Sequence, residues 1–218
     1  MGARFQSLYS GFLGSAGQIG LVEQVFDGFK GEDTLIMVDP VMGDGGKLYR
    51  TYTQEMADGM ARLCQKADIV VPNMTEACHL LGRPYNPGPY TREEIREILH
   101  QLCALGPKMA VLTGVWLKEG TLGTACCDAR TGEAELYLTD RIEGFYHGTG
   151  DLFASALLGG LLNGGSLKGS CEIATEFTWR TIETTFEKST DYRFGPKFEC
   201  HLPWLAEKME ACRKTVAN

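Results

Sequence analysis

Apolar runs separated by amphipathic stretches are the dominant pattern along the chain. Three runs rich in β-branched residues have the length of buried strands, and a shorter run near the start predicts one more. They lie at 34–40 (TLIMVDP), 68–73 (DIVVPN), 108–114 (KMAVLTG) and 5–13 (FQSLYSGFL). The alternation of such runs with helical stretches predicts right-handed crossovers and a mostly parallel sheet with both faces covered.

Apolar spacing and polar start signals predict the helices between these strands. After Gly14 the side chains of Ile19, Val22, Phe26 and Phe29 share one helical face. Three further helices begin with the spacing of a capping box, in which a polar side chain is followed three residues later by Gln or Glu. The pairs are Thr51 with Gln54, Asn73 with Glu76, and Thr91 with Glu94, and the helices are expected to end near Lys66, Gly82 and Gly106.

The pattern changes in the second half of the chain. Two alternating stretches within 121–138 are separated by Arg-Thr-Gly, which predicts a β-hairpin inserted into the strand–helix alternation. Helices are predicted at 150–163, at about 168–188 and from Pro203, and the Gly/Pro-rich stretch 82–90 predicts a surface loop. Because no repeat or linker interrupts the chain, residues 1–218 are expected to form a single domain.

Composition excludes several classes of protein. The 218 residues carry a net charge of −7, and the acidic residues are scattered, so nucleic acid is not expected as a partner. No stretch has the length and apolarity of a membrane span, and the eight cysteines form no C-x-x-C motif. These features are typical of a protein in a reducing compartment, and we expect a cytoplasmic location with no membrane partner.

Polar residues cluster where the predicted strands end. Ligands of open α/β sheets bind beyond the carboxyl ends of the strands, so these residues are candidates for a shared site. Each has a structural explanation as well, because a carboxylate can terminate a strand, Asn and Glu can cap a helix, and Thr-Gly can form a turn. The candidates are Asp39 with Asp44, Asn73 with Glu76, Thr113 with Gly114, and the stretch 148–151.

The sequence HGTGD at 147–151 precedes the apolar run LFASALLGGLL. Its glycines let the backbone approach a ligand, and the first amides of the following helix lack partners within the helix, so an anion can bind there. Asp151 has a second explanation as a favourable charge at a helix N-terminus, worth about 0.3–1 kcal/mol. Other motifs fail on spacing: Phe153 breaks a dinucleotide fingerprint, and the P-loop, nucleophile-elbow and zinc patterns are absent.

Five segments together resemble the ribokinase-like superfamily and, within it, the pyridoxal/pyridoxamine kinases. They are SGFLGS (10–15), DPVMGDGGKLY (39–49), PNMTE (72–76), VLTG (111–114) and GTGDLFASALLGG (148–160). The resemblance implies a three-layer α/β sandwich with a mostly parallel central sheet. It also implies an enzyme that uses ATP and Mg²⁺ to phosphorylate the 5′-hydroxymethyl group of a vitamin B6 vitamer, and a homodimer.

The resemblance also implies a role for each candidate residue. Asp151 matches the catalytic base, and Gly148, Thr149 and Gly150 match an anion hole around the transferred phosphoryl group. Asp39 and Glu76 match the positions that hold Mg²⁺. The ATP-binding positions correspond to Asp44, Tyr49, Asn73, Thr113 and Gly114.

The sequence departs from the family at two places. Val71 stands where several relatives have a hydroxyl residue, and relatives have about one more βαβ unit before SGFLGS, so we expect a shortened chain with exposed apolar surface. Two alternatives stay open. One is hydroxymethylpyrimidine kinase, whose members have the same fold but tend to have Cys at the position of Asp151; the other is a nucleotide-binding protein without catalytic activity.

Overall fold

A central sheet organises the computed structural model, which describes residues 3–188 and 195–216. The strand order is β1-β2-β5-β6-β7-β8. The first four strands run parallel, β7 pairs antiparallel with β6, and β8 pairs antiparallel with β7. This mostly parallel sheet with one added hairpin confirms the predicted arrangement. The strands are β1 (Ser7–Ser10), β2 (Leu35–Val38), β5 (Ile69–Val70), β6 (Met109–Val115), β7 (Thr121–Asp128) and β8 (Ala134–Asp140).

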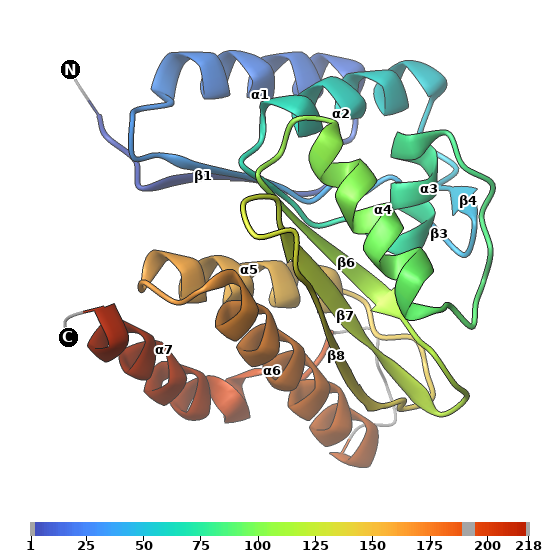
Figure 1. Cartoon of the computed structure of the whole chain (residues 1–218), viewed down its shortest axis with the longest axis vertical. Helices are drawn as coiled ribbons and strands as arrows, with labels where there is room; N and C mark the ends of the chain where they lie inside the picture. The colour runs from blue at the N-terminus through green and yellow to red at the C-terminus, as the bar shows by residue number, and fades with distance from the viewer. Residues whose placement is uncertain (1–2, 189–194, 217–218) are drawn as a thin grey trace.

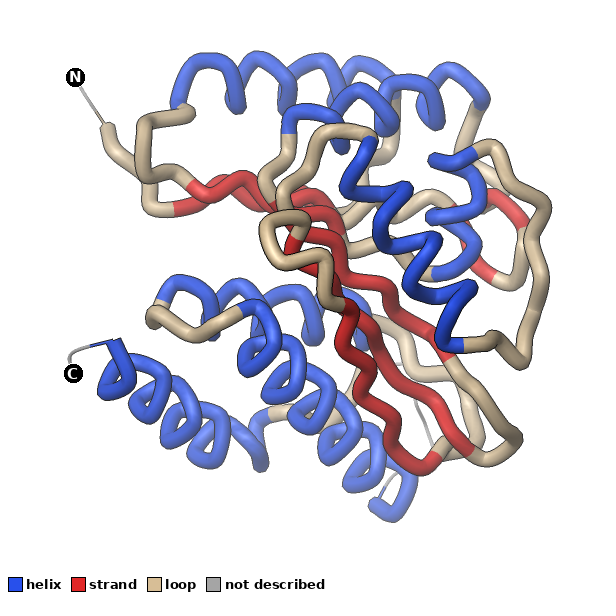
Figure 2. The backbone as a smooth tube through the Cα atoms, viewed as in Figure 1, coloured by secondary structure: helices blue, strands red, loops and turns tan. Residues whose placement is uncertain are grey.

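Helices cover both faces of the sheet and complete a three-layer sandwich (Figures 1 and 2). One layer contains α1 (Ala16–Phe29), α2 (Gln54–Lys66), α3 (Met74–Leu81) and α4 (Arg92–Ala104). The opposite layer contains α5 (Thr149–Leu162), α6 (Leu167–Lys188) and α7 (Leu202–Val216), with the short 3-10 helix η1 (Glu199–His201) before α7. No helix in the described part of the chain is long and apolar enough to cross a membrane.

Successive residues of β2 enter opposite halves of the core. Ile36 and Val38 pack in the cluster formed with α1, α2 and α4, whereas Met37 packs in the cluster formed with α5 and α6. Ile69 and Val70 of β5 divide in the same way. Because both faces are buried, these strands are continuously apolar rather than alternating, which explains the runs seen in the sequence.

The predicted start signals are correct for two of the three helices. Capping boxes are present at Asn73 with Glu76 and at Thr91 with Glu94. The prediction for Thr51 is wrong, because the N-cap of α2 is Thr53, whose hydroxyl accepts a hydrogen bond from the Met56 amide at 3.2 Å.

The missed start of α2 has a local cause. Gln54 is the first helical residue and its side chain binds Asp58 one turn later, at 2.9 Å, so it does not reach back to form a box with Thr51. Thr53 supplies the oxygen that the first turn requires.

A small second sheet was not predicted. It pairs β3 (Gly43–Asp44) with β4 (Lys47–Leu48) in an antiparallel hairpin. Gly45 and Gly46 form its two-residue turn with φ values of +58° and +79°, a backbone conformation that other residues rarely adopt. The Asp-Gly-Gly sequence at 44–46 is typical of such a hairpin turn.

Apolar side chains are exposed around β1, which is an edge strand, and α1. The sequence led us to expect exposed apolar surface, and Phe29, which continues the helical face of Ile19 and Phe26, is 44% exposed and meets Phe5 edge-on at 5.4 Å. Ile19 and Phe26, on the same helical face, are buried. The exposed side chains include Phe5, Phe12, Leu21, Val25 and Phe29.

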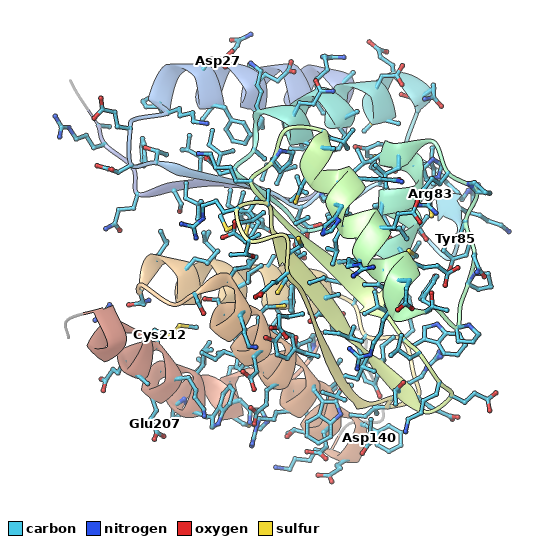
Figure 3. The ribbon with its side chains drawn as sticks, viewed as in Figure 1. Asp27, Arg83, Tyr85, Asp140, Glu207 and Cys212 are labelled. Atoms are coloured by element: carbon cyan, nitrogen blue, oxygen red, sulfur yellow. The ribbon has the colours of Figure 1, made fainter. Side chains whose placement is uncertain are left out.

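The cysteines are free thiols in the described part of the chain, and most of them are buried in the core. Figure 3 shows Cys212 near the end of α7. The predicted surface loop 82–90 is largely exposed, and the ring of Tyr85 from this loop packs against the glycine turn of the β3–β4 hairpin.

Candidate active site

Asp39 follows the carboxyl end of β2 and is only 6% exposed. Its amide donates to the carbonyl oxygen of Ser10 at 2.9 Å, which anchors the residue beside β1. Among the described residues its carboxylate accepts no hydrogen bond and forms no ion pair. Burial, and next the charge of Asp151, raise the pKa of Asp39 to about 7.

Glu76 lies in the first turn of α3 and is 3% exposed. Its Oε2 accepts from the Asn73 amide at 2.8 Å and its Oε1 accepts from the Met42 amide at 3.1 Å. Burial, and next the charge of Asp39, raise the pKa of Glu76 to about 8, although the backbone donors partly offset this effect. In the described part of the chain neither Glu76 nor Asp39 has a Lys or Arg partner.

Asn73 connects the β3–β4 hairpin to the start of α3. Its Oδ1 accepts from the Glu76 amide at 3.0 Å, and its Nδ2 donates to the Gly43 carbonyl at 2.9 Å. The Thr75 hydroxyl accepts from the Gly46 amide at 2.9 Å. These bonds hold the loop after β2 against α3.

The side chains of Tyr49 and Asp44 lie on this loop and are exposed. The Tyr49 amide donates to the Met42 carbonyl at 2.9 Å. Partial burial, and then the charges of Glu76, Asp44 and Asp39, raise the pKa of Tyr49. The Tyr49 phenol therefore lies close enough to all three carboxylates for their charges to act on it.

Thr113 and Gly114 lie beside Asn73 at the end of β6. Thr113 pairs with Asn73 in a parallel bridge, and its amide donates to the Pro72 carbonyl at 3.0 Å. The pairing of β6 with β7 shifts register between Thr113 and Val115, so Gly114 occupies an irregular point of the strand. Asp39 and Asn73 thus follow β2 and β5, and Thr113 lies near the carboxyl end of the neighbouring strand β6.

The start of α5 matches the prediction of an open helix N-terminus. Gly148 is the N-cap, with φ of +83°, and no side chain caps the helix. The Thr149 hydroxyl donates instead to the Tyr146 carbonyl at 3.1 Å. Gly150 and Asp151 are exposed. The first amides of the helix are therefore available to an anion.

Asp151 also approaches β1. A methyl group on Gly11 would lie 3.5 Å from Asp151 Oδ1 and 3.2 Å from the hydroxyl oxygen of Tyr9. Burial, and then the charges of Asp39 and Asp151, raise the pKa of Tyr9. Sequence reasoning missed Tyr9, because a tyrosine within a short apolar strand gives no signal that its hydroxyl reaches a helix far along the chain.

The acidic residues do not form a metal cage. No group of three or more His, Cys, Asp or Glu side chains within the described residues is arranged to hold a metal ion. Mg²⁺ commonly keeps several waters and uses one or two carboxylates together with phosphate oxygens. A buried carboxylate without a cationic partner, such as Asp39, fits a hydrated ion of this kind.

A ribokinase-like α/β sandwich with an acidic rim and an open helix N-terminus defines a class of proteins suited to a phosphate-bearing ligand. The chain belongs to the phosphomethylpyrimidine kinase family, whose sequence profile matches residues 3–195.

The relatives include both vitamin B6 and pyrimidine kinases. The chain is 28% identical over 161 residues to a pyridoxal kinase of Arabidopsis thaliana, covering 71% of this chain and 50% of the relative. It is 30% identical over 186 residues to a hydroxymethylpyrimidine/phosphomethylpyrimidine kinase of Streptomyces coelicolor, covering 83% and 64%. The chain thus spans between half and two thirds of the length of these relatives.

A solved structure shares the fold closely. It is a Bacteroides thetaiotaomicron protein, provisionally described as a phosphomethylpyrimidine kinase, in a crystal form with pyridoxal. The TM-score is 0.88 at 34% sequence identity, and the match covers 94% of this chain and 72% of that protein.

Proposed function

We propose that the chain is an ATP-dependent kinase that phosphorylates the 5′-hydroxymethyl group of pyridoxal, pyridoxamine or pyridoxine. One observation carries the proposal. Asp151, exposed at the open start of α5, contributes to the field that raises the pKa of Asp39, the buried carboxyl at the end of β2. This supports placing the proposed base and the proposed anion-binding helix start near the strand ends where Asp39, Asn73 and Thr113 lie.

The proposed reaction needs positioning and charge neutralisation more than a strong base. The hydroxymethyl oxygen forms a bond to the γ-phosphorus of ATP, the bond from that phosphorus to the bridging oxygen breaks, and ADP leaves. The hydroxyl proton passes to Asp151. The amides of Gly148, Thr149 and Gly150 are the proposed donors to the transferred phosphoryl group, which suits a helix start without a side-chain cap.

Asp39 and Glu76 are the proposed residues for Mg²⁺, which would neutralise phosphate charge when bound. Support comes from their burial without a cationic partner among the described residues. The proposed ATP contacts lie on the loop and strand ends around these carboxylates. They are Asp44, Tyr49, Asn73, Thr113 and Gly114.

The choice of acceptor is supported by the relatives. The Arabidopsis relative is a pyridoxal kinase, and the Bacteroides protein was crystallised with pyridoxal. The family description and the Streptomyces relative favour a second candidate, a hydroxymethylpyrimidine kinase. Both acceptors present a hydroxymethyl group on a heteroaromatic ring. Because hydroxymethylpyrimidine kinases tend to have Cys at the position of Asp151, the carboxylate at this position favours the vitamin B6 acceptor.

The test uses the purified 218-residue chain with ATP and Mg²⁺. Pyridoxal, pyridoxamine, pyridoxine and hydroxymethylpyrimidine are supplied separately, and phosphorylated product is measured by mass spectrometry. Product from a B6 vitamer supports the proposal, and product from the pyrimidine alone favours the second candidate. ATP binding by calorimetry without any product favours a nucleotide-binding protein without catalytic activity.

We also propose that the protein is a cytoplasmic homodimer. The exposed apolar side chains of α1, including Leu21 and Val25, support association. Sedimentation equilibrium of the purified chain measures its mass, and a monomer at all concentrations would contradict this part of the proposal.

A further inference from the structure

Tyr9 reaches the candidate site from the edge strand. It pairs with Met37 in the β1–β2 register, two residues before Asp39, and Met37 faces the layer that contains α5. The Tyr9 side chain is 37% exposed, so its ring is only partly used in packing. Its hydroxyl lies near Gly11, and the carboxylate of Asp151, from α5, lies near the same residue.

The missing side chain of Gly11 leaves a small space between two oxygen atoms. A methyl carbon placed there would be 3.2 Å from the Tyr9 hydroxyl oxygen and 3.5 Å from Asp151 Oδ1. The space in front of Gly11, beyond the position of that methyl carbon, is therefore flanked by a phenol on one side and a carboxylate on the other.

The Tyr9 hydroxyl is a free donor at neutral pH. Burial, and then the charges of Asp39 and Asp151, raise the pKa of Tyr9, so the phenol stays protonated. Within the described part of the chain it donates no hydrogen bond. A tyrosine that served only to pack against the sheet would not need a hydroxyl at this position.

Resting on the proposed function, we infer that Tyr9 contacts the acceptor alcohol. The alcohol oxygen lies in front of Gly11, beyond the position of an added methyl carbon, where Asp151 accepts its proton and the Tyr9 phenol donates a hydrogen bond to it. An alcohol oxygen has two lone pairs. The bond from Tyr9 engages one of them and leaves the other directed at the γ-phosphorus, which orients the nucleophile.

Tyr9→Phe removes only the hydroxyl and tests this contact. We expect kcat/KM for the acceptor to fall about 10-fold or more, while KM for ATP stays within about 2-fold of the parent. Tyr137→Phe is the matched control. Tyr137 is on β8 and its buried hydroxyl has no hydrogen-bond partner among the described residues, so the control variant keeps the parent constants.

Equilibrium binding separates a contact with the acceptor hydroxyl from a general loss of structure. Pyridoxal and 5-deoxypyridoxal, which lacks the acceptor hydroxyl, are titrated in the presence of ADP and Mg²⁺. We expect the parent to prefer pyridoxal by about 10-fold and Tyr9→Phe to prefer it by less than about 2-fold. A preference in Tyr9→Phe equal to that of the parent would overturn the inference.

Filling the space provides an independent variant. Gly11→Ala is expected to weaken pyridoxal binding about 10-fold or more while ATP binding is retained, because the methyl group projects toward the space where the alcohol oxygen is inferred to lie. Gly28→Ala, with open space around it at the end of α1, is the control and binds both ligands as the parent does. Equal pyridoxal affinity in Gly11→Ala and the parent would contradict the inference.

The outcomes distinguish the inference from the proposed function. A parent chain that binds no vitamer and phosphorylates none would contradict both the proposed function and the inference about Tyr9. A parent chain that phosphorylates pyridoxal, together with a Tyr9→Phe variant of unchanged kcat/KM and unchanged discrimination, removes only the role of Tyr9.

Discussion

Asp39 and Asp151 are close enough to interact electrostatically, although Asp39 follows a strand and Asp151 lies in the first turn of a helix in the opposite layer. Burial contributes most to the raised pKa of Asp39, and the charge of Asp151 contributes next. Two like charges held close together raise the free energy of the folded protein when both carboxylates are ionised. A cation or a proton bound between them lowers it, which connects the stability of the fold to the proposed use of the site.

Removing the proposed base is the most direct activity prediction. In Asp151→Asn the amide cannot accept the proton of the acceptor, so kcat is expected to fall by about 100- to 10,000-fold. ATP affinity measured by calorimetry is expected to stay within about 3-fold of the parent, because the first amides of α5 are unchanged. Asp140→Asn, at the exposed end of β8, is the control and retains parent turnover. Equal kcat in Asp151→Asn and the parent would exclude Asp151 as the base.

The two buried carboxyls predict how stability changes with pH. Their folded-state pKa values of about 7 for Asp39 and about 8 for Glu76 exceed the values near 4 of an unfolded chain. Between about pH 4 and pH 8 the folded state therefore binds more protons than the unfolded state. By linkage, the stabilisation is complete below about pH 4 and is lost as pH rises toward 8.

Urea unfolding at several pH values between 5 and 8 measures this loss. The free energy of unfolding of the parent chain is expected to fall by roughly 2 kcal/mol or more over that range. Asp39→Asn cannot ionise and also removes a charge that raises the pKa of Glu76, so its unfolding free energy should depend less on pH. Glu32→Gln, in an exposed loop, should keep the parent slope. An identical slope in Asp39→Asn would contradict the assignment of the loss to this pair.

Much of the rim could be predicted from the sequence because its residues follow local rules. Asp39 terminates an apolar run, and Asn73 with Glu76 has the spacing of a capping box, so each could be placed without knowing the rest of the fold. Their gathering at one edge then follows from the parallel order of β2, β5 and β6. The roles assigned to these residues stay predictions until variants are measured.

The features that were missed depend on contacts between distant or competing segments. Tyr9 and Asp151 both lie beside Gly11 because of the β1–β2 register and the direction of α5, and neither is encoded locally. Thr51 and Thr53 are both plausible helix starts, and the side chain of Gln54 decides between them by turning toward Asp58. Phe29 continues the helical stripe but lies beside the sheet edge, where the described residues leave it partly uncovered.

The two capping boxes provide a matched pair of variants. Asn73→Ala and Thr91→Ala each remove an N-cap oxygen, so each is expected to lower the free energy of unfolding by about 1 kcal/mol. Asn73 also donates to Gly43 and thereby holds the β3–β4 hairpin against α3. We therefore expect only Asn73→Ala to weaken ATP–Mg²⁺ binding, by about 5-fold or more, measured by calorimetry. Equal ATP affinity in both variants would show that the hairpin does not contribute to nucleotide binding.

Gly148 and Gly150 occupy the same helix start but differ in backbone conformation. Gly148 has φ of +83° and open space around its Cα, so the only cost of Gly148→Ala is the strained backbone, about 1–2 kcal/mol in the free energy of unfolding. Gly150 is a helical residue with no atom within 4 Å of an added methyl group, so Gly150→Ala is expected to raise the free energy of unfolding by up to about 1 kcal/mol. Urea unfolding of both variants measures the difference. If the backbone of Gly148→Ala relaxes to relieve the strain, the first amides of α5 will be reoriented, and turnover is expected to fall. A Gly148→Ala variant as stable and as active as the parent would show that the left-handed N-cap is not required.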